Sequence, residues 1–382
     1  MAMACLPWPA NIEREKPVET VSTGFSFLKY DIDNCLPAFR PPSPIDLHLA
    51  RTWFMIPKVL APTIETACLL EATARKPGNV HPLARFADCD WDDFRASASA
   101  IAPILAEAPP RQVGRVILEA VRATRAAVGK NTNLGMILLI APLAAATRGT
   151  EGNWSDRVHQ VVATTTVDDC RRVYEAIRLA QPGGLRQVDQ ADISDDPAIT
   201  LTAAMTLAAP RDLVARQYTN GFREVIRLSH CFTAAHWDAL ELEILQAQLE
   251  SMARDPDTLI ARKCGWSVAE HSARLARDTL EGRCQLKTLD QWLRADGHRR
   301  NPGTTADLLA AGLFVALWEG RIPRFEPRMI HQWAERARAN QAPLPSWESP
   351  PPPQPSVSPN VSRATIRHTG GNHSGGDHCP TD

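Results

Sequence analysis

Apolar residues recur at helical spacing from Pro57 onward, and this periodicity limits the possible folds more than any other feature of the sequence. Ile64, Ala67 and Cys68, for example, share one face of a predicted helix that ends before Pro77. The alternation of apolar and polar residues that marks half-buried strands is missing, as are the usual hairpin dipeptides. The sequence therefore predicts an all-α fold of about ten helices.

Further helices are expected at 91–108, 113–128, 136–146, 154–164, 167–180, 234–254, 256–281, 288–296 and 304–318, with two helical pieces between 198 and 233. Several begin with residues whose side chains can satisfy the free N–H groups of a first turn. The predicted capping pairs are Asp90 with Asp93, Thr166 with Asp169, and Thr304 with Asp307.

The organisation of the chain follows from shifts in composition. With 382 residues and a hydrophobic fraction of 44%, the chain can bury a large core. Prolines crowd residues 1–55, which we expect to form a poorly ordered extension; Met55 is an equally good candidate for the natural start. Residues 56–340 are predicted to form one helical domain, and residues 341–382, rich in Pro, Gly, Ser and His, a disordered tail.

Charge and cysteine usage exclude several classes of protein. A net charge of −1 gives no case for a nucleic-acid partner. Nine scattered cysteines without a CxxC pair indicate reduced thiols, and we expect no signal peptide from the composition of residues 1–16. The apolar run 136–146 is too short to span a bilayer. We expect a cytoplasmic protein without a membrane partner, and the sequence leaves a homo-oligomer possible.

Three polar loops carry most of the residues that could do chemistry. They are 75–91, which opens with Arg75-Lys76-Pro77-Gly78-Asn79-Val80-His81, then 129–135, Gly-Lys-Asn-Thr-Asn-Leu-Gly, and 301–307, Asn-Pro-Gly-Thr-Thr-Ala-Asp. Each lies at the end or the start of a predicted helix. We expect the three loops to meet at one site.

The first loop combines a cation with carboxylates. Lys76 beside Gly78 suits a phosphate contact, although a solvated lysine at a helix C-terminus explains it equally well. Asp88 and Asp90, at alternate positions, can reach one Mg²⁺ ion. The alternative is that Asp90 caps the next helix and Asp88 is solvated.

The second loop offers amides and a hydroxyl from Asn131, Thr132 and Asn133 ahead of a very apolar helix. A helix N-terminus binds anions, but Thr132 or Asn133 also serves as a simple N-cap. Lys130 does not complete a P-loop, because Thr124 occupies the position of the required upstream glycine.

Four motifs stand in a recognisable order: Lys76-Pro77-Gly78, Asp88-x-Asp90, Asn131-Thr132-x-x-Gly135 and Pro302-Gly303-x-x-Ala306-Asp307. In this order and at these separations the chain resembles the triphosphoribosyl-dephospho-coenzyme A synthase family over about residues 60–320. The resemblance implies a helical fold with ATP and dephospho-CoA as substrates. It implies transfer of the 5-triphosphoribosyl group to the 2′-hydroxyl of dephospho-CoA, with release of adenine.

This chemistry builds positive charge on the ribose and keeps a triphosphate in place, so the resemblance implies roles for acidic and phosphate-binding residues. Asp88, Asp90 and Glu71 are the predicted catalytic residues, and Asp88 and Asp90 the predicted Mg²⁺ ligands. An exposed pair with Arg75 explains Glu71 as well. The predicted substrate-binding residues are Lys76, Gly78, Asn79, Asn131, Thr132, Asn133 and Asp307.

The chain departs from the family pattern at two places. Asn133-Leu134 replaces a His-Lys pair, and Asn79-Val80-His81 replaces a Val-Asp pair. A divergent branch of the family is similar at two further segments, Gly183-Gly184-Leu185-x-x-Val188-Asp189 and Asp257-Thr258-Leu259-Ile260-Ala261-Arg262-Lys263. This resemblance, with Asn133-Leu134 in place of His-Lys, motivates the alternative of a related enzyme with a different acceptor, in pterin-linked one-carbon metabolism. A third hypothesis is a non-enzymatic scaffold whose Pro350–Pro353 run recruits partners.

Overall fold

The computed structural model describes residues 44–184, 192–341 and 344–345, with side chains from residue 56 onward. By its internal contacts the chain divides into residues 1–50 and 51–382, and the packing below is that of the second unit. Most of the predicted extension 1–55 and nearly all of the predicted tail 341–382, including Pro350–Pro353, lie outside the described residues.

The described parts of the chain hold fifteen α-helices and no strand, so the predicted all-α fold is confirmed. The helices are α1 Pro44–Thr73, α2 Trp91–Ala106, α3 Val113–Val128, α4 Leu134–Ala146, α5 Trp154–Ala163, α6 Val167–Ala180, α7 Leu201–Ala208, α8 Leu213–Asn220, α9 Arg223–Ser229, α10 Trp237–Arg254, α11 Thr258–Cys264, α12 Trp266–Leu280, α13 Leu286–Arg294, α14 Gly303–Trp318 and α15 Pro327–Asn340.

The observed helices differ from the predicted ones both in number and in bounds, and residues 198–233, for example, contain the three helices α7, α8 and α9 where two pieces were predicted. The first helix begins at Pro44, upstream of the predicted Pro57, and carries Pro57 and Pro62 in its interior. The predicted helix 256–281 is two helices, because Gly265 adopts a φ of 97° between α11 and α12. Helix α15 was not predicted, since only Ile330 and Ala334 of its side chains are buried and its apolar signal is weak.

Two of the three predicted capping pairs are confirmed. Asp90 and Thr166 each form a capping box at the start of α2 and α6. The prediction for Thr304 with Asp307 was wrong, because α14 begins one residue earlier and its N-cap, Pro302, offers no side-chain oxygen. The first-turn N–H of Thr305 instead donates to Asp257 Oδ2 at 2.8 Å.

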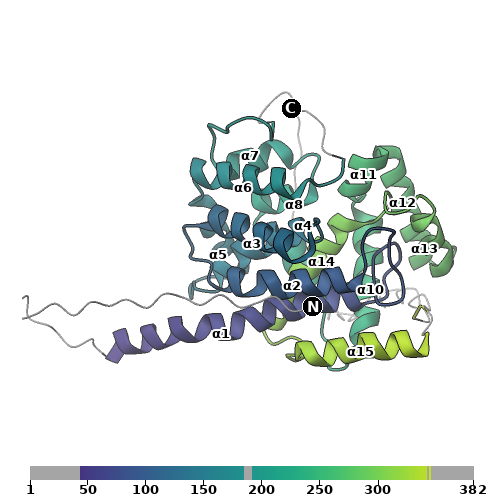
Figure 1. Cartoon of the computed structure of the whole chain (residues 1–382), viewed down its shortest axis with the longest axis horizontal. Coiled ribbons are helices and arrows are strands. Elements are labelled where there is room, and N and C mark those ends of the chain that lie inside the picture. The colour runs from purple at the N-terminus through teal and green to yellow at the C-terminus, as the bar shows by residue number, and fades with distance from the viewer. Residues whose placement is uncertain (1–43, 185–191, 342–343, 346–382) are drawn as a thin grey trace, which may run out of the picture. The chain divides into compact units, whose positions relative to one another are not determined.

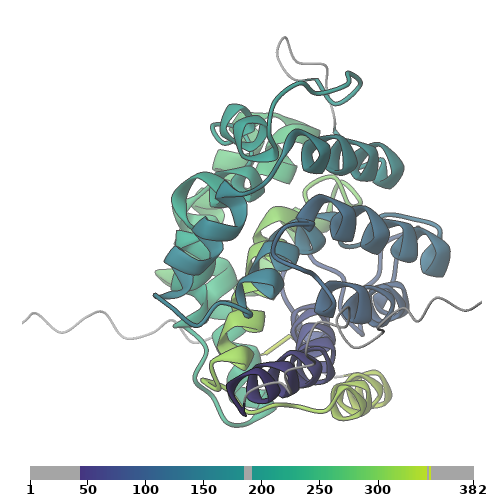
Figure 2. The ribbon, with the colours of Figure 1, turned by 90° about the vertical axis from the view of Figure 1, so that its left-hand side faces the viewer.

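Helices α4 and α14 form the centre of the fold because they are apolar on all sides. Helix α14 packs against α4, α9 and α10, and α4 packs against α3 and α5 (Figure 1). Helix α3 lies between α2 and α6, as the turned view also shows (Figure 2). The N-termini of α4 and α14 thereby come close together, which brings the second and third polar loops to one place.

A second, smaller core lies where α10, α12 and α13 meet, with Leu245, Leu249, Leu289 and Leu293 among its buried side chains. This core fixes α13 beside the first polar loop, as the contacts below show. No helix in the described residues combines the length and the apolar character that a membrane crossing requires.

Candidate active site

One cavity of about 900 Å³ takes residues from all three predicted polar loops. Asn79 and Asp88 come from the first loop, Lys130 from the second and Asn301 from the third. Most of the remaining wall comes from α4, α6, α7, α8, α11 and α14, with one residue each from α1, α2, α3 and α12. A volume of this size is at the upper end for small-molecule sites, so the cavity suits a large or a composite ligand.

The cavity has two chemically different walls. Its apolar wall comes from α4, α6, α7 and α8, with the side chains Leu138, Val173, Ile177, Leu201, Ala204, Met205, Val214 and Ala215. Its polar wall comes from the loops, α11 and the first turn of α14, with Asn79, Asp88, Lys130, Asn131, Thr132, Arg262, Lys263, Asn301, Thr304 and Asp307. Such a division fits a ligand with an apolar or aromatic part and a charged part.

Cationic side chains on the polar wall come from the second loop and from α11. Lys130 Nζ donates to the Asp88 carbonyl at 2.7 Å and to Asp93 Oδ2 at 3.0 Å. Burial lowers the pKa of Lys263, whose Nζ lies 3.4 Å from the carbonyl of His298. Burial disfavours the charged form of this lysine, and one long hydrogen bond compensates for little of that loss. An anion that binds to the ammonium group would supply the missing interaction.

The first loop is held in place by its backbone. Gly78 has a φ of 75°, and its N–H donates to Asp290 Oδ1 of α13 at 2.8 Å. A Cβ at this position would lie 2.8 Å from Leu293 Cδ1, so only glycine fits. Gly78 is not among the residues that line the cavity, and its part in the site is to shape the loop.

Asn79 faces the cavity and is fixed by three neighbours. Its Nδ2 donates to Asn301 Oδ1 at 2.7 Å, and its Oδ1 accepts from Gln248 Nε2 at 2.7 Å. Arg294 Nη2 donates to its carbonyl at 2.6 Å. The first and third loops are therefore linked directly through the Asn79–Asn301 hydrogen bond.

Lys76 does not line the cavity. Its side chain is fully buried, and its Nζ lies 3.0 Å from Glu71 Oε1 and 3.3 Å from the Ala74 carbonyl. Burial raises the pKa of Glu71, and the Lys76 ammonium opposes that rise. Glu71 lines the cavity with Lys76 behind it, and Arg75 pairs with Glu241 instead, at 2.6 Å.

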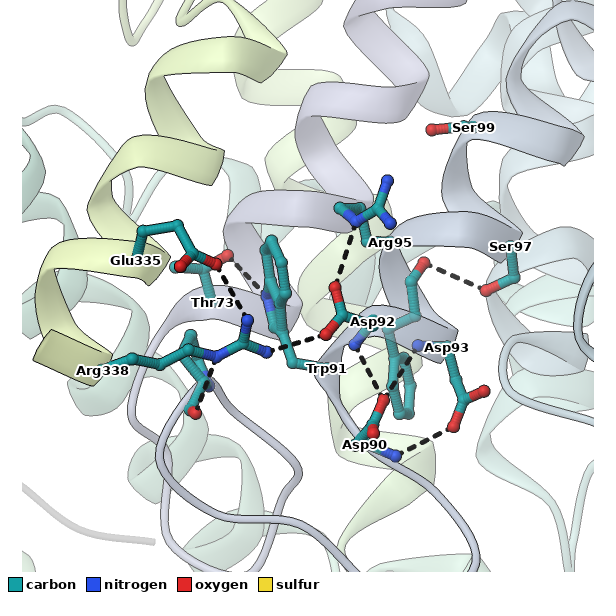
Figure 3. A network of polar contacts seen from close by, with 12 residues as sticks. Thr73, Asp90, Trp91, Asp92, Asp93, Arg95, Ser97, Ser99, Glu335 and Arg338 are labelled. Atoms are coloured by element: carbon teal, nitrogen blue, oxygen red, sulfur yellow. Dashed lines mark hydrogen bonds and ion pairs between the residues drawn. The ribbon is translucent and has the colours of Figure 1, made fainter.

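Asp88 and Asp90 have different surroundings. The Asp88 side chain lines the cavity, is 67% exposed, and places Oδ1 3.5 Å from His298 Nδ1. Asp90 does not line the cavity; its Oδ1 accepts from the N–H groups of Asp92 and Asp93 at 3.0 and 3.2 Å (Figure 3). Asp90 therefore caps α2, and this leaves its Oδ2 without a hydrogen bond from any described residue.

The start of α2 is anchored by a network around Trp91. The indole Nε1 donates to Thr73 Oγ1 at 3.0 Å, and Arg338 of α15 donates to Asp92 Oδ2 at 3.1 Å (Figure 3). Arg338 also reaches Glu335 at 2.9 Å and lies over the Trp91 ring. This network holds the second half of the first loop against α1 and α15.

The second loop uses its side chains to form the start of α4. Asn131 Oδ1 accepts from the Leu134 N–H at 3.1 Å, and Thr132 Oγ1 donates to Ser97 Oγ at 2.8 Å. Asn133 Oδ1 accepts from Thr124 Oγ1 at 3.0 Å, and its buried Nδ2 has no partner among the described residues. All three line the cavity at the positive end of the α4 dipole.

Asp307, in the first turn of α14, lies against Gly135 of α4. A Cβ at Gly135 would be 1.9 Å from Asp307 Oδ2, so the carboxyl group occupies the space that a side chain would need. Burial, with Glu71 as the next contributor, raises the pKa of Asp307 well above its usual range. The α4 dipole acts in the opposite direction, by about 0.3–1 kcal/mol.

Sequence analysis assigned no role in the site to Asp257, Arg262 and Lys263, although the segment 257–263 is part of the resemblance to a divergent branch of the family. Arg262 lines the cavity and pairs with Asp212 at 2.5 Å, and Lys263 follows it on α11. Asp257 accepts from both the N–H and the hydroxyl of Thr305 and so joins the starts of α11 and α14. The available signal was a short basic helix behind an aspartate, which is equally typical of an exposed helix with an ordinary N-cap.

A comparison with curated proteins gives no match. A crystal structure from Archaeoglobus fulgidus, provisionally assigned as a triphosphoribosyl-dephospho-CoA synthase, is 26% identical, with a TM-score of 0.48; the alignment covers 59% of this chain and 98% of that one. Residues 57–324 match the family CitG, described as ATP:dephospho-CoA triphosphoribosyl transferase. This match confirms the resemblance drawn from the four motifs. The chain belongs to the ATP:dephospho-CoA triphosphoribosyl transferase family and is an enzyme.

Proposed function

We propose that this protein transfers the 5-triphosphoribosyl group of ATP to the 2′-hydroxyl of 3′-dephospho-CoA and releases adenine. The observation that carries the proposal is the cavity of about 900 Å³ with one cationic, polar wall and one apolar wall. ATP and dephospho-CoA, the substrates in the family description, both combine an aromatic base with phosphates. Residues 56–340, which include the matched 57–324, are the proposed catalytic domain.

The triphosphate belongs on the polar wall. Lys130 and Lys263 supply positive charge there, and Asn131 and Thr132 lie at the start of α4. The resemblance places a lysine where this chain has Leu134. Because Lys130 and Lys263 already line the same cavity, the loss of that lysine leaves cationic contacts available.

Mg²⁺ is the proposed metal, and the residues present fit it. This ion is usually held by one or two carboxylates together with waters and substrate phosphates. No group of three or more His, Cys, Asp or Glu side chains in the described residues could hold a metal ion, so a site made of protein ligands alone is not proposed. Asp88, which lines the cavity, would be the protein ligand beside waters and the triphosphate, and the ion would neutralise triphosphate charge; Asp90, predicted as a second ligand, instead caps α2 outside the cavity lining.

Cleavage of the glycosidic bond builds positive charge on the ribose, which carboxylates stabilise in a water-poor site. Glu71 is suited to this part because it lines the cavity and its carboxyl group lies 3.0 Å from the Lys76 ammonium, which opposes the rise in the Glu71 pKa that burial causes. The ribose would then lie near Glu71, between the cationic loops and the apolar wall. Lys76 acts through Glu71 and not on the phosphates.

The test is adenine release from ATP and Mg²⁺, followed by chromatography, with dephospho-CoA, without it, and with its 2′-deoxy analogue. We expect release only with the 2′-hydroxyl acceptor, and a large loss in Asp88→Asn. Asp168→Asn, an exposed residue of α6 away from the cavity, serves as the control. Release of ADP or AMP in place of adenine would overturn the proposal.

A further inference from the structure

Asp307 stands at the boundary between the two walls of the cavity. It belongs to the first turn of α14 and contacts Gly135, the second residue of α4. On one side of Gly135 lies the polar loop with Asn133, and on the other Met136 and Leu138 continue into the apolar wall. If the triphosphate binds the polar loops and the purine binds the apolar wall, the bond between them lies at this boundary.

The Asp307 carboxyl group has no structural role as a hydrogen-bond acceptor or ion-pair partner in the described residues. No described residue donates a hydrogen bond to it or lies within ion-pair distance of it, whereas Asp212 pairs with Arg262 and Asp257 accepts from Thr305. Its close contact with Gly135 fixes its position without satisfying its oxygens. A positioned carboxyl group that lines a cavity and lacks protein partners is available to a bound ligand.

The charges around Asp307 favour its protonated form. Glu71 of α1, Asp257 before α11 and Asp212 before α8 are acidic, and Cys68 of α1 is a buried thiol. Arg262 is the cation that opposes them, but it is paired with Asp212. The α4 N-terminus also favours the carboxylate. Burial among these acidic groups outweighs both and raises the pKa of Asp307.

We infer that Asp307 is the catalytic general acid that protonates the departing purine. This inference rests on the proposed function. As the bond from C1 of the ribose to the purine nitrogen breaks, its electron pair stays on the purine, which takes the proton of Asp307. The oxygen of the acceptor hydroxyl forms the new bond to C1, and its proton passes to water. Asp307 is left as a carboxylate and regains a proton from solvent before the next turnover.

The test compares two leaving groups in the wild type and in Asp307→Asn. ATP needs a proton on its base, whereas 4-nitrophenyl β-riboside 5-triphosphate releases a phenolate that needs none. We expect the variant to lose about 10²–10⁴-fold in turnover of ATP and to keep turnover of the nitrophenyl substrate within about tenfold of the wild type. Equal losses on both substrates, or no loss on ATP, would overturn the inference.

A second measurement, the pH dependence of kcat with ATP, tests the inference if the wild-type enzyme does not turn over the nitrophenyl substrate. Its kcat with ATP should fall as the pH rises through the raised pKa of Asp307, and Asp307→Asn should lack this fall. A variant that keeps the fall contradicts the inference. Asp255→Asn is the control, because Asp255 is also partly buried but pairs with Arg216 outside the cavity. Wild-type protein that releases no adenine at all refutes the proposed function itself.

Discussion

Lys76 and Glu71 form an ion pair at 3.0 Å in which both side chains are almost fully buried. Removing one partner leaves a buried charge without compensation, which costs about 3–5 kcal/mol. We therefore expect Lys76→Met to lower the free energy of unfolding by about this amount, measured by urea denaturation. The exposed pair Arg122–Glu175, at 2.6 Å, is the control, and Arg122→Met should cost less than about 1 kcal/mol.

If Lys76→Met and Arg122→Met lower the free energy of unfolding by the same amount, Lys76 does not form the buried ion pair with Glu71 that the structure shows. A phosphate-binding Lys76 would instead show a large loss of ATP affinity in Lys76→Met with little loss of stability.

Gly135→Ala tests the contact with Asp307 from the other side. The new Cβ would lie 1.9 Å from Asp307 Oδ2, so the carboxyl group must move. We expect a loss of about 1–3 kcal/mol in the free energy of unfolding and a marked fall in adenine release. In an Asp307→Asn background the same change should lower turnover little further. Gly149→Ala is the control, since its Cβ would approach no atom closer than 3.4 Å.

Substitutions of Asp88 and Asp90 should have different effects, one on the Mg²⁺ requirement for turnover and the other on the stability of the fold. Asp90→Ala removes the N-cap of α2 and should cost about 0.5–2 kcal/mol of unfolding free energy, read from a urea midpoint. Asp88→Ala should leave that midpoint unchanged and raise the Mg²⁺ concentration needed for half-maximal turnover. A change in midpoint for Asp88→Ala together with an unchanged Mg²⁺ requirement would refute the assignment of Asp88.

His81 makes the folded protein sensitive to acid. Burial, with the charge of Arg294, lowers its pKa from 6.5 to about 3. Because the pKa is lower in the folded state, His81 stabilises the fold above pH 6.5, and this stabilisation is lost as the pH falls from 6.5 toward 3. We expect His81→Gln to show a shallower decline of the urea midpoint over this range. The exposed His159, replaced by Gln in the same way, is the control position.

Local signals account for what the sequence predicted well. The capping boxes of Asp90 and Thr166 each join residues that are three positions apart in the chain, so they can be recognised in the sequence. The apolar composition of residues 136–146 was enough by itself to predict a buried helix.

Tertiary contacts account for what the sequence could not predict. Lys76 looked solvated or phosphate-bound because its pairing with the nearby Glu71 depends on the burial of both side chains in the folded chain, which the local sequence does not show. Lys263 reaches the cavity only because Asp257 ties α11 to the start of α14, across 48 residues of chain. Asp307 looked like a capping residue, and its contact with Gly135 depends on the crossing of α4 and α14.

The most direct test of the account is the mass spectrum of dephospho-CoA after incubation with enzyme, Mg²⁺ and ATP labelled uniformly in its ribose carbons. We predict an acceptor that has gained a labelled triphosphoribosyl group, with unlabelled adenine released in equal amount. An acceptor that gained an adenylyl or a phosphoryl group, or an unchanged acceptor, would contradict it.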